Sequence, residues 1–257
     1  MARLNLSEVS DHELLDPVAA YDRIAPVFMR LAERNRAYLD TVEGLVISQI
    51  PSGSRSFLGV GSGDGTRATR IARACGLTQV TLLEPSAAMR RNYPADAEVW
   101  AIRAEELHRQ QGRFDIITCL WNVLGHIFPF TARAELLRQL ARLVSPQGLI
   151  LTDVTHRYNA RQYGAPITTM RLLRDFVSRD IRNGDVRVVW DVDGTRCATS
   201  GHVFTGREMK SLARLSRLEI VNRWVIDYAS GERRRWPCEG NLLYALRPIT
   251  GRVEPDN

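Results

Sequence analysis

The stretch Ser56-Phe57-Leu58-Gly59-Val60-Gly61-Ser62-Gly63-Asp64-Gly65-Thr66 decides how this chain folds. Its apolar part, Phe57 to Val60, is typical of a buried parallel strand. Three glycines follow at alternate positions, and glycines so placed let the backbone turn tightly and pass close to a ligand. A helical pattern then runs from about Thr66 to Ala74. The stretch therefore predicts a strand, a tight turn and a helix in succession.

A second apolar run, Val80 to Leu83, follows this helix and ends in Glu84. An acid at the tip of the second strand is well placed to accept hydrogen bonds from the two hydroxyls of a ribose. Together, the glycine turn and the acid predict that a nucleoside-containing cofactor lies at the carboxyl edge of a parallel sheet.

The spacing of the glycines distinguishes between cofactors. A dinucleotide fingerprint, G-x-G-x-x-G, would need its third glycine where Thr66 stands. The observed G-x-G-x-G pattern resembles the first motif of the class I S-adenosylmethionine-dependent methyltransferases. The run Phe114 to Leu120 is similar to the fourth strand of that family, and Leu143 to Leu151 is similar to the Pro-Gly turn that introduces its fifth. The resemblance covers roughly residues 21–154 and implies S-adenosyl-L-methionine as the cofactor.

The fold that the resemblance implies is α/β, with a Rossmann-like, seven-stranded, mostly parallel sheet, helices on both faces and an antiparallel terminal strand. We expect an N-terminal helical cap over residues 1–50 and the cofactor-binding core over 51–159. Short alternating runs with turn signals at Asn183-Gly184 and Asp193-Gly194 predict a small inserted antiparallel lid over 160–204. The C-terminal part of the core would then occupy 205–248, followed by a tail over 249–257.

One position departs from the family pattern. Members usually carry Asp or Glu two residues before the first glycine of the motif, where this chain has Gly59. In the family that acid helps to hold the methionine end of the cofactor. We therefore expect backbone groups, water or another side chain to replace it, and the loss of cofactor binding stays open as an alternative.

The resemblance assigns a set of cofactor contacts to this chain. Tyr21 belongs to a segment that many small-molecule members fold over the cofactor, although it could equally be a packing tyrosine. Arg103 stands where the family often has Asp, so the contact with adenine falls to Ala104 or Glu105. The full set is Tyr21, Gly59, Gly61, Ser62, Gly63, Glu84, Pro85, Met89, Ala104, Glu105, Leu120 and Trp121.

His126 is the candidate catalytic residue. It follows the predicted fourth strand, whose end faces both the sulfonium and the acceptor in the family. A neutral imidazole near pH 7 can take a proton from a hydroxyl or ammonium group of the acceptor. The alternative is a histidine packed beside the cofactor.

Polar side chains near the carboxyl ends of the fourth and fifth strands are the candidates for acceptor binding, because substrates of such sheets lie at that edge. Among them, Arg157 could grip a carboxylate or phosphate with two hydrogen bonds. Those after the fifth strand could instead belong to a surface turn, and a histidine in an alternating strand could be structural. The candidates are Asn122, His156, Arg157, Tyr158 and Asn159, with His202 from the predicted lid.

Composition limits the class of protein. The 257 residues are 44% hydrophobic, which suits one domain with an elaboration. The formal net charge is +6, but the longest basic run is Arg233-Arg234-Arg235, which favours dispersed arginines over a nucleic-acid surface. The four cysteines form no C-x-x-C pair, and no apolar run reaches membrane-spanning length. We expect a cytoplasmic protein without a metal, a membrane or a nucleic-acid partner, and the oligomeric state stays open.

These observations predict an S-adenosylmethionine-dependent methyltransferase that acts by in-line displacement on a small-molecule acceptor, at an O, N or C centre. A lid favours a small acceptor, since it encloses the reactants and excludes water. The basic balance keeps an RNA methyltransferase as one alternative, and Gly59 keeps a non-catalytic cofactor-binding protein as another.

Overall fold

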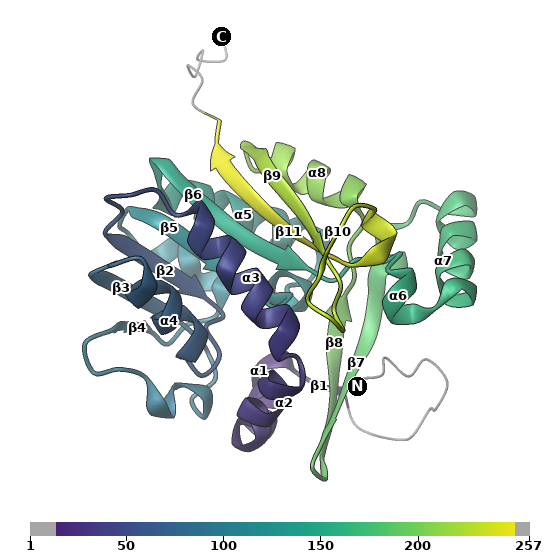
Figure 1. Ribbon diagram of the computed structural model, residues 1–257, viewed down its shortest axis with the longest axis horizontal. Helices are drawn as coiled ribbons and strands as arrows, with labels where there is room; N and C mark the ends of the chain where they lie inside the picture. The colour runs from purple at the N-terminus through teal and green to yellow at the C-terminus, as the bar shows by residue number, and fades with distance from the viewer. Residues whose placement is uncertain (1–13, 250–257) are drawn as a thin grey trace.

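The computed structural model describes residues 14–249 and contains two sheets (Figure 1). The larger sheet has the strand order β10-β9-β11-β6-β5-β2-β3-β4. Its strands, in chain order, are β2 Ser56–Val60, β3 Gln79–Leu83, β4 Glu98–Trp100, β5 Phe114–Cys119, β6 Val144–Val154, β9 Leu218–Ile226, β10 Arg233–Arg234 and β11 Asn241–Pro248. The smaller sheet has the order β1-β8-β7 and consists of β1 Leu14–Leu15, β7 Asp185–Val192 and β8 Thr195–His202.

The larger sheet confirms the predicted fold class. Strands β2 to β6 pair in parallel, and β11 lies antiparallel between β6 and β9. The sheet has one strand more than predicted, because the two-residue β10 adds to the edge beside β9. Since the parallel strands all end at one edge, the loops after β2, β3, β4, β5 and β6 meet there.

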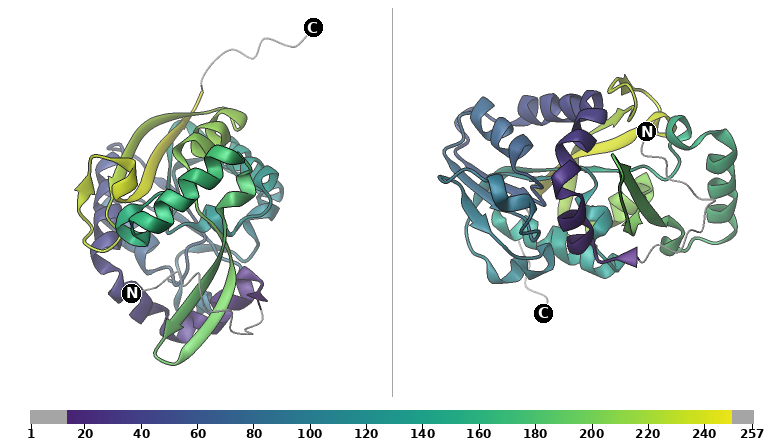
Figure 2. Two further views of the ribbon diagram at one scale, coloured as in Figure 1. Left: turned by 90° about the vertical axis from the view of Figure 1, so that its right-hand side faces the viewer. Right: turned by 90° about the horizontal axis from the view of Figure 1, so that it is seen from below.

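Helices cover both faces of this sheet (Figure 2). Along β2, Phe57 points toward α3 Arg36–Gln49 and α4 Thr66–Ala74, while Leu58 and Val60 point toward α5 Phe130–Leu143 and α8 Gly206–Leu215. This alternation follows from the two-residue period of a strand. Short 3-10 helices join the other elements: η1 Ala25–Val27, η2 Met89–Asn92, η3 Ala104–Arg109, η4 Val123–His126, η5 Ile181–Gly184 and η6 Pro237–Glu239.

The turn between β2 and α4 has the predicted form. Gly61 has a φ of +63°, and a Cβ there would lie 2.6 Å from the Val123 side chain. Gly65 has a φ of +78°, and its Cβ would lie 2.9 Å from the Tyr93 ring. Both the left-handed backbone and the close approach require glycine. Helix α4 then begins at Thr66 and ends at Ala74, as the sequence predicts.

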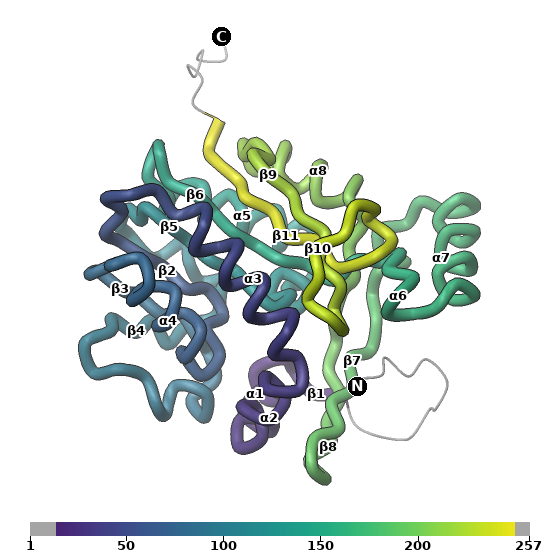
Figure 3. Tube along the Cα trace, viewed as in Figure 1, coloured from purple at the N-terminus to yellow at the C-terminus, as the bar shows by residue number. Residues whose placement is uncertain are grey.

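The N-terminal helices divide between the two sheets. Helix α3 packs on the larger sheet, whereas α1 Pro17–Ile24 and α2 Phe28–Arg34 form an apolar cluster with Met89 and with Trp190, Val192 and Cys197 of the smaller sheet. Figure 3 shows α1 and α2 beside the β7–β8 hairpin. The first thirteen residues of the expected cap, and the expected tail apart from Ile249, lie outside the described residues.

The segment 160–204 is only partly the antiparallel insertion that its sequence predicts. Its first half is helical, with α6 Ala160–Tyr163 and α7 Ala165–Val177 before η5. Pro166 stands in the first turn of α7, where proline fits a helix. The second half is the β7–β8 hairpin, which turns at Asp193 and Gly194 with φ values of 49° and 80°. Positive φ at both turn residues is the geometry that two-residue hairpins favour.

Candidate active site

A cavity of about 660 Å³ opens at the carboxyl edge of the larger sheet. Residues 14–18 and helices α1 to α3 contribute to its wall opposite the sheet. Every predicted cofactor residue except Gly59 and Met89 lines it: Tyr21, Gly61, Ser62, Gly63, Glu84, Pro85, Ala104, Glu105, Leu120 and Trp121. The predicted base, His126, lines the same cavity.

The two exceptions lie in the protein interior. Met89 is 3% exposed and packs against the N-terminal helices. Gly59 lies inside strand β2, where the hydroxyl of Ser62 donates to its carbonyl oxygen at 2.8 Å. A Cβ on Gly59 would lie 2.5 Å from Ser62 Oγ. The Ser62 hydroxyl therefore fills the space into which an acidic side chain at position 59 would project.

Glu84 is held firmly at the tip of β3. Its Oε2 accepts a hydrogen bond from the Gly63 amide and its Oε1 accepts one from the Ser86 amide, both at 2.9 Å. Burial raises the pKa of Glu84 to about 7, although both amide donors and Arg90 oppose that shift. A carboxylate oxygen can accept a second hydrogen bond. Each oxygen of Glu84 can therefore still accept one from a ligand hydroxyl.

The ring of His126 has a defined tautomer. Its Nδ1 lies 3.0 Å from the carbonyl oxygen of Ser200, and a carbonyl can only accept, so Nδ1 carries the hydrogen. Nε2 then carries the ring's lone pair, which accepts a long hydrogen bond from the Tyr21 hydroxyl at 3.4 Å. Burial lowers the pKa of His126 and raises that of Tyr21. Both groups are therefore neutral near pH 7 and face each other on the cavity wall.

The chain after β5 is strained where it enters the site. Trp121 and Asn122 have φ values of 64° and 60°, which tryptophan rarely adopts. The Trp121 amide donates to Asp153 Oδ1, which holds the turn from β6. Asn122 donates to the carbonyl of His202 at 3.2 Å and accepts from the Thr155 amide at 3.0 Å. The amide group of Asn122 thus joins β5, β6 and β8, and the turn directs the Trp121 ring into the cavity.

A second, smaller chamber of about 100 Å³ adjoins the cavity. The two share Tyr21, Phe28, Trp121 and His126 in their linings. The rest of the chamber is lined by strand β7 and by the ends of β5 and β6, together with nearby residues: Leu31, Tyr38, Asn122, Asp153, Thr155, Gln162, Val186, Val188, Val189, Trp190, Val203, Tyr228 and Asn241. Of the predicted acceptor residues, all of which the structure describes, Asn122 alone lines one of these two spaces.

The other predicted acceptor residues line neither space. His156 is 4% exposed, and burial lowers its pKa to about 4. Tyr158 packs its ring against His156 and donates its hydroxyl to Asp175. Asn159 caps α6 by accepting from the Gln162 amide at 3.2 Å, and its side chain donates to Asn241.

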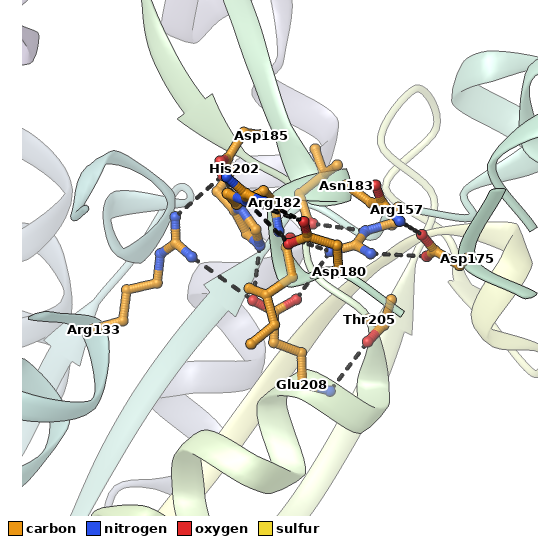
Figure 4. Close-up of polar contacts among 12 residues, drawn as sticks. Arg133, Arg157, Asp175, Asp180, Arg182, Asn183, Asp185, His202, Thr205 and Glu208 are labelled. Carbon is orange, nitrogen blue, oxygen red and sulfur yellow. Dashed lines mark hydrogen bonds and ion pairs between the residues drawn. The ribbon is translucent and has the colours of Figure 1, made fainter. Parts of the chain in front are cut away.

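Arg157 and His202 belong to a buried cluster of charged side chains behind the site (Figure 4). Arg157 donates to Asp175 at 2.8 Å and to Glu208 at 3.2 Å. The two ring nitrogens of His202 face Asp185 at 2.6 Å and Glu208 at 2.8 Å. These contacts tie α7, the β7–β8 hairpin and α8 to the end of β6, so the cluster positions the hairpin that covers the smaller chamber.

Sequence reasoning missed several residues of the site. Arg67 lines the cavity with its guanidinium 5.9 Å from the centre of the Trp121 ring, and its Nη1 is buried without a hydrogen-bond partner. The sequence did not mark Phe28 and Trp190 as site residues, because aromatic residues in apolar runs usually belong to the hydrophobic core. Asp153 did give one, since it is an acid inside the apolar run Leu149 to Val154.

Comparison with known proteins places the chain in a family. The model of a methyltransferase domain matches residues 23–222. Similar solved structures include the CcbJ methyltransferase from Streptomyces caelestis, with a TM-score of 0.61 and 15% identity over 81% of this chain and 89% of the other. An S-adenosylmethionine-dependent methyltransferase from Clostridium acetobutylicum has a TM-score of 0.59 and 12% identity over 87% and 98%. A Haloferax volcanii methyltransferase in complex with the Trm112 activator has a TM-score of 0.62 and 13% identity over 92% and 100%.

No curated protein matches this sequence. Since the family model covers most of the chain, the protein belongs to the methyltransferase domain family, and its expected cofactor is S-adenosyl-L-methionine. Among residues 14–249, no three His, Cys, Asp or Glu side chains are grouped so as to hold a metal ion. Within the same range, no helix has the length and apolar character needed to cross a bilayer.

Proposed function

We propose that the protein transfers a methyl group from S-adenosyl-L-methionine in the larger cavity to a small-molecule acceptor in the smaller chamber. The observation that carries this proposal is the shared wall, because Tyr21, Phe28, Trp121 and His126 line both spaces. Because these residues line both spaces, the two spaces adjoin, and a donor in one would meet an acceptor in the other beside them. Alignment of two reactants is the main task of a transferase.

The residues of the larger cavity fit the cofactor. Glu84 has free acceptor capacity for two ribose hydroxyls, and the glycine turn allows the backbone to approach closely. Ala104 and Glu105 line the same cavity and would contact the adenine, and the unpartnered Nη1 of Arg67 suits the carboxylate of the methionine part. When bound, the cofactor supplies an electrophilic methyl group on a sulfonium centre.

The residues of the chain itself would orient the acceptor, exclude water and accept the one proton that the acceptor loses. The β7–β8 hairpin and helices α1 and α2 cover the smaller chamber, which keeps water away from the reactants. The Ser200 carbonyl orients the His126 ring, and its Nε2 can take the proton that the acceptor loses when the acceptor replaces the Tyr21 hydroxyl as the hydrogen-bond donor.

A small acceptor also fits the size and charge of the chamber better than RNA does. An RNA substrate needs a basic surface that neutralises phosphates. The chamber has a volume of about 100 Å³, and its wall carries a carboxylate. The arginines of this chain are spread along the sequence without a long basic run.

Calorimetric titration of the purified protein with S-adenosylmethionine and S-adenosylhomocysteine, with NAD as the control ligand, tests the cofactor. We expect both sulfur nucleosides to bind and NAD not to bind. Absence of binding by the sulfur nucleosides would contradict the proposal. A screen of small acceptors against radiolabelled methyl donor, with bulk RNA as a parallel substrate, tests the acceptor class, and methylation of RNA alone would reject a small acceptor.

A further inference from the structure

The smaller chamber has a single formal charge on its wall. Of the described residues that line it, only Asp153 is charged at neutral pH in its ordinary state; the remainder are aromatic, aliphatic or neutral polar residues. The arginines among the described residues around the two spaces line the larger cavity, together with six acidic residues: Arg36, Arg67, Arg70 and Arg103, with Asp16, Glu33, Asp40, Asp64, Glu84 and Glu105. The chamber itself is therefore lined by a carboxylate and by no cationic side chain of the described residues.

The side chain of Asp153 is fixed by hydrogen bonds and can still accept further hydrogen bonds from a ligand. It is 1% exposed, and its Oδ2 accepts a hydrogen bond from the Tyr38 hydroxyl at 2.6 Å while Oδ1 accepts from the Trp121 amide. Burial raises the pKa of Asp153, and the positive charge of Arg67, the Tyr38 hydroxyl and the Trp121 amide oppose that rise. Both carboxylate oxygens keep capacity for a further donor. A buried carboxylate with unused acceptor capacity favours a cationic ligand.

The aromatic walls of the chamber favour the same kind of ligand. The ring centres of Tyr21 and Trp190 are 5.2 Å apart, and those of Phe28 and Trp121 are 5.5 Å apart. The ring of His126 lies 6.1 Å from that of Trp190. At these distances the rings pack against one another, so they form a continuous aromatic wall on one side of the chamber, and an ammonium group that lies against such a wall is attracted by cation–π interaction.

We propose that the acceptor is an amine, which binds in the smaller chamber as a cation between the aromatic rings and Asp153. This inference rests on the proposed function, because it identifies the substrate class of the same site. An ammonium nitrogen must lose one proton before its lone pair is free, and Nε2 of His126 can accept that proton once the ammonium group replaces the Tyr21 hydroxyl as its donor. An acceptor with a carboxylate or phosphate would instead bring a second negative charge beside Asp153.

Tryptophan fluorescence can test this, since Trp121 and Trp190 both line the chamber. The purified full chain is saturated with S-adenosylhomocysteine and then titrated with benzylamine, benzyl alcohol and benzoate, which share a ring and differ in charge. We expect benzylamine to bind at least tenfold more tightly than benzyl alcohol, and benzoate to bind more weakly still. Equal binding of the three probes, tighter benzoate binding, or no binding of benzylamine would overturn the amine assignment while the proposed function stands.

The variant D153N removes the charge and keeps the shape. We expect its benzylamine affinity to fall about tenfold, with affinity for S-adenosylhomocysteine retained. D96N removes one carboxylate from an exposed position and should leave benzylamine binding unchanged. If D153N does not fold, the comparison of the three probes on the unmodified protein still decides. If S-adenosylhomocysteine does not bind the unmodified protein, the proposed function and the amine assignment both fail.

Discussion

At the scale of single residues, the ionisation of the Glu84 carboxyl group should make cofactor affinity depend on pH. Ribose hydroxyls donate to a carboxylate, so the cofactor should bind the ionised form. Because burial raises the pKa of Glu84 to about 7, affinity should be full above that pH and should fall as the pH drops through it, by up to roughly tenfold per pH unit. Calorimetric titration with S-adenosylhomocysteine between pH 5.5 and pH 8.5 would measure this.

The matched variant for that experiment is E84Q, which cannot ionise. Its affinity should be weaker by roughly 1–3 kcal/mol at pH 8, as expected for a lost charged hydrogen-bond partner. Its affinity should also vary much less between pH 6 and pH 8. A wild-type profile that is flat in this range would show that Glu84 does not hold the ribose.

His126 is predicted to act on the acceptor and not on the cofactor. H126A should leave affinity for S-adenosylhomocysteine nearly unchanged and lower turnover about 10²- to 10⁴-fold, which is the usual contribution of a general base. Y21F keeps the ring of Tyr21 and removes the hydroxyl that faces Nε2 at 3.4 Å, so its loss of turnover should be smaller. Equal losses of cofactor binding and turnover in H126A would give His126 a packing role.

Gly59 poses a different question at the same scale, namely what replaces the usual acid. A side chain at this position would meet the Ser62 hydroxyl at 2.5 Å. We therefore expect G59D to lower the melting temperature and weaken cofactor binding. The double variant G59D/S62G, which removes the obstructing hydroxyl, should recover part of both losses. If the single and double variants behave alike, Ser62 does not occupy the place of the acid.

At the scale of elements, the buried charged cluster is what fixes the hairpin. Arg157 is 4% exposed and contacts Asp175 and Glu208 from two other elements. R157A removes the cation from both carboxylates, which keep their contacts with His202 and Tyr158. Loss of one partner of a buried ion pair costs up to about 3–5 kcal/mol, and the variant should speed hydrogen exchange along β7 and β8. R182A breaks the exposed Arg182–Asp180 pair and should cost less than about 1 kcal/mol. Similar unfolding free energies for the two variants would contradict this role.

Elements could be predicted from the sequence where their signals are local. The apolar run before the glycines and the periodic residues after them specify β2 and α4, because both patterns depend on near neighbours in the chain. The segment 160–184 was harder. The alternating runs that begin at Asp180 suggested that the whole insertion consists of strands, but Pro166 in a first turn and the contact of Arg157 with Asp175 stabilise helix α7. That second contact joins residues from different elements, and no local pattern reveals it.

The same contrast explains the candidate site. Residues of the larger cavity such as Gly61 and Glu84 could be predicted, because they belong to a turn and a strand end whose positions the chain order determines. Most of the predicted acceptor residues could not, since Arg157 lies beyond Val154, the last residue of β6, where no strand period sets the direction of its side chain. Its tertiary partners Asp175 and Glu208 hold it in the buried cluster, whereas Asp153, inside β6, lines the chamber.

At the scale of the whole molecule, the cofactor cavity joins parts that lie far apart in the chain. Its wall includes residues 14–18, helix α3, the glycine turn, Glu84 and Ser200 of β8. A ligand that contacts all of them should stabilise the fold as a unit. At a concentration about a hundredfold above its dissociation constant, S-adenosylhomocysteine should add about 2.7 kcal/mol. For a chain of this size that corresponds to a rise in melting temperature of roughly 5–10 °C, measurable by differential scanning calorimetry.

At the same ligand concentration E84Q should show a smaller rise, because its affinity is lower, whereas R182A should match the unmodified protein. A rise equal in E84Q and the unmodified protein would mean that the ligand binds elsewhere than at the glycine turn.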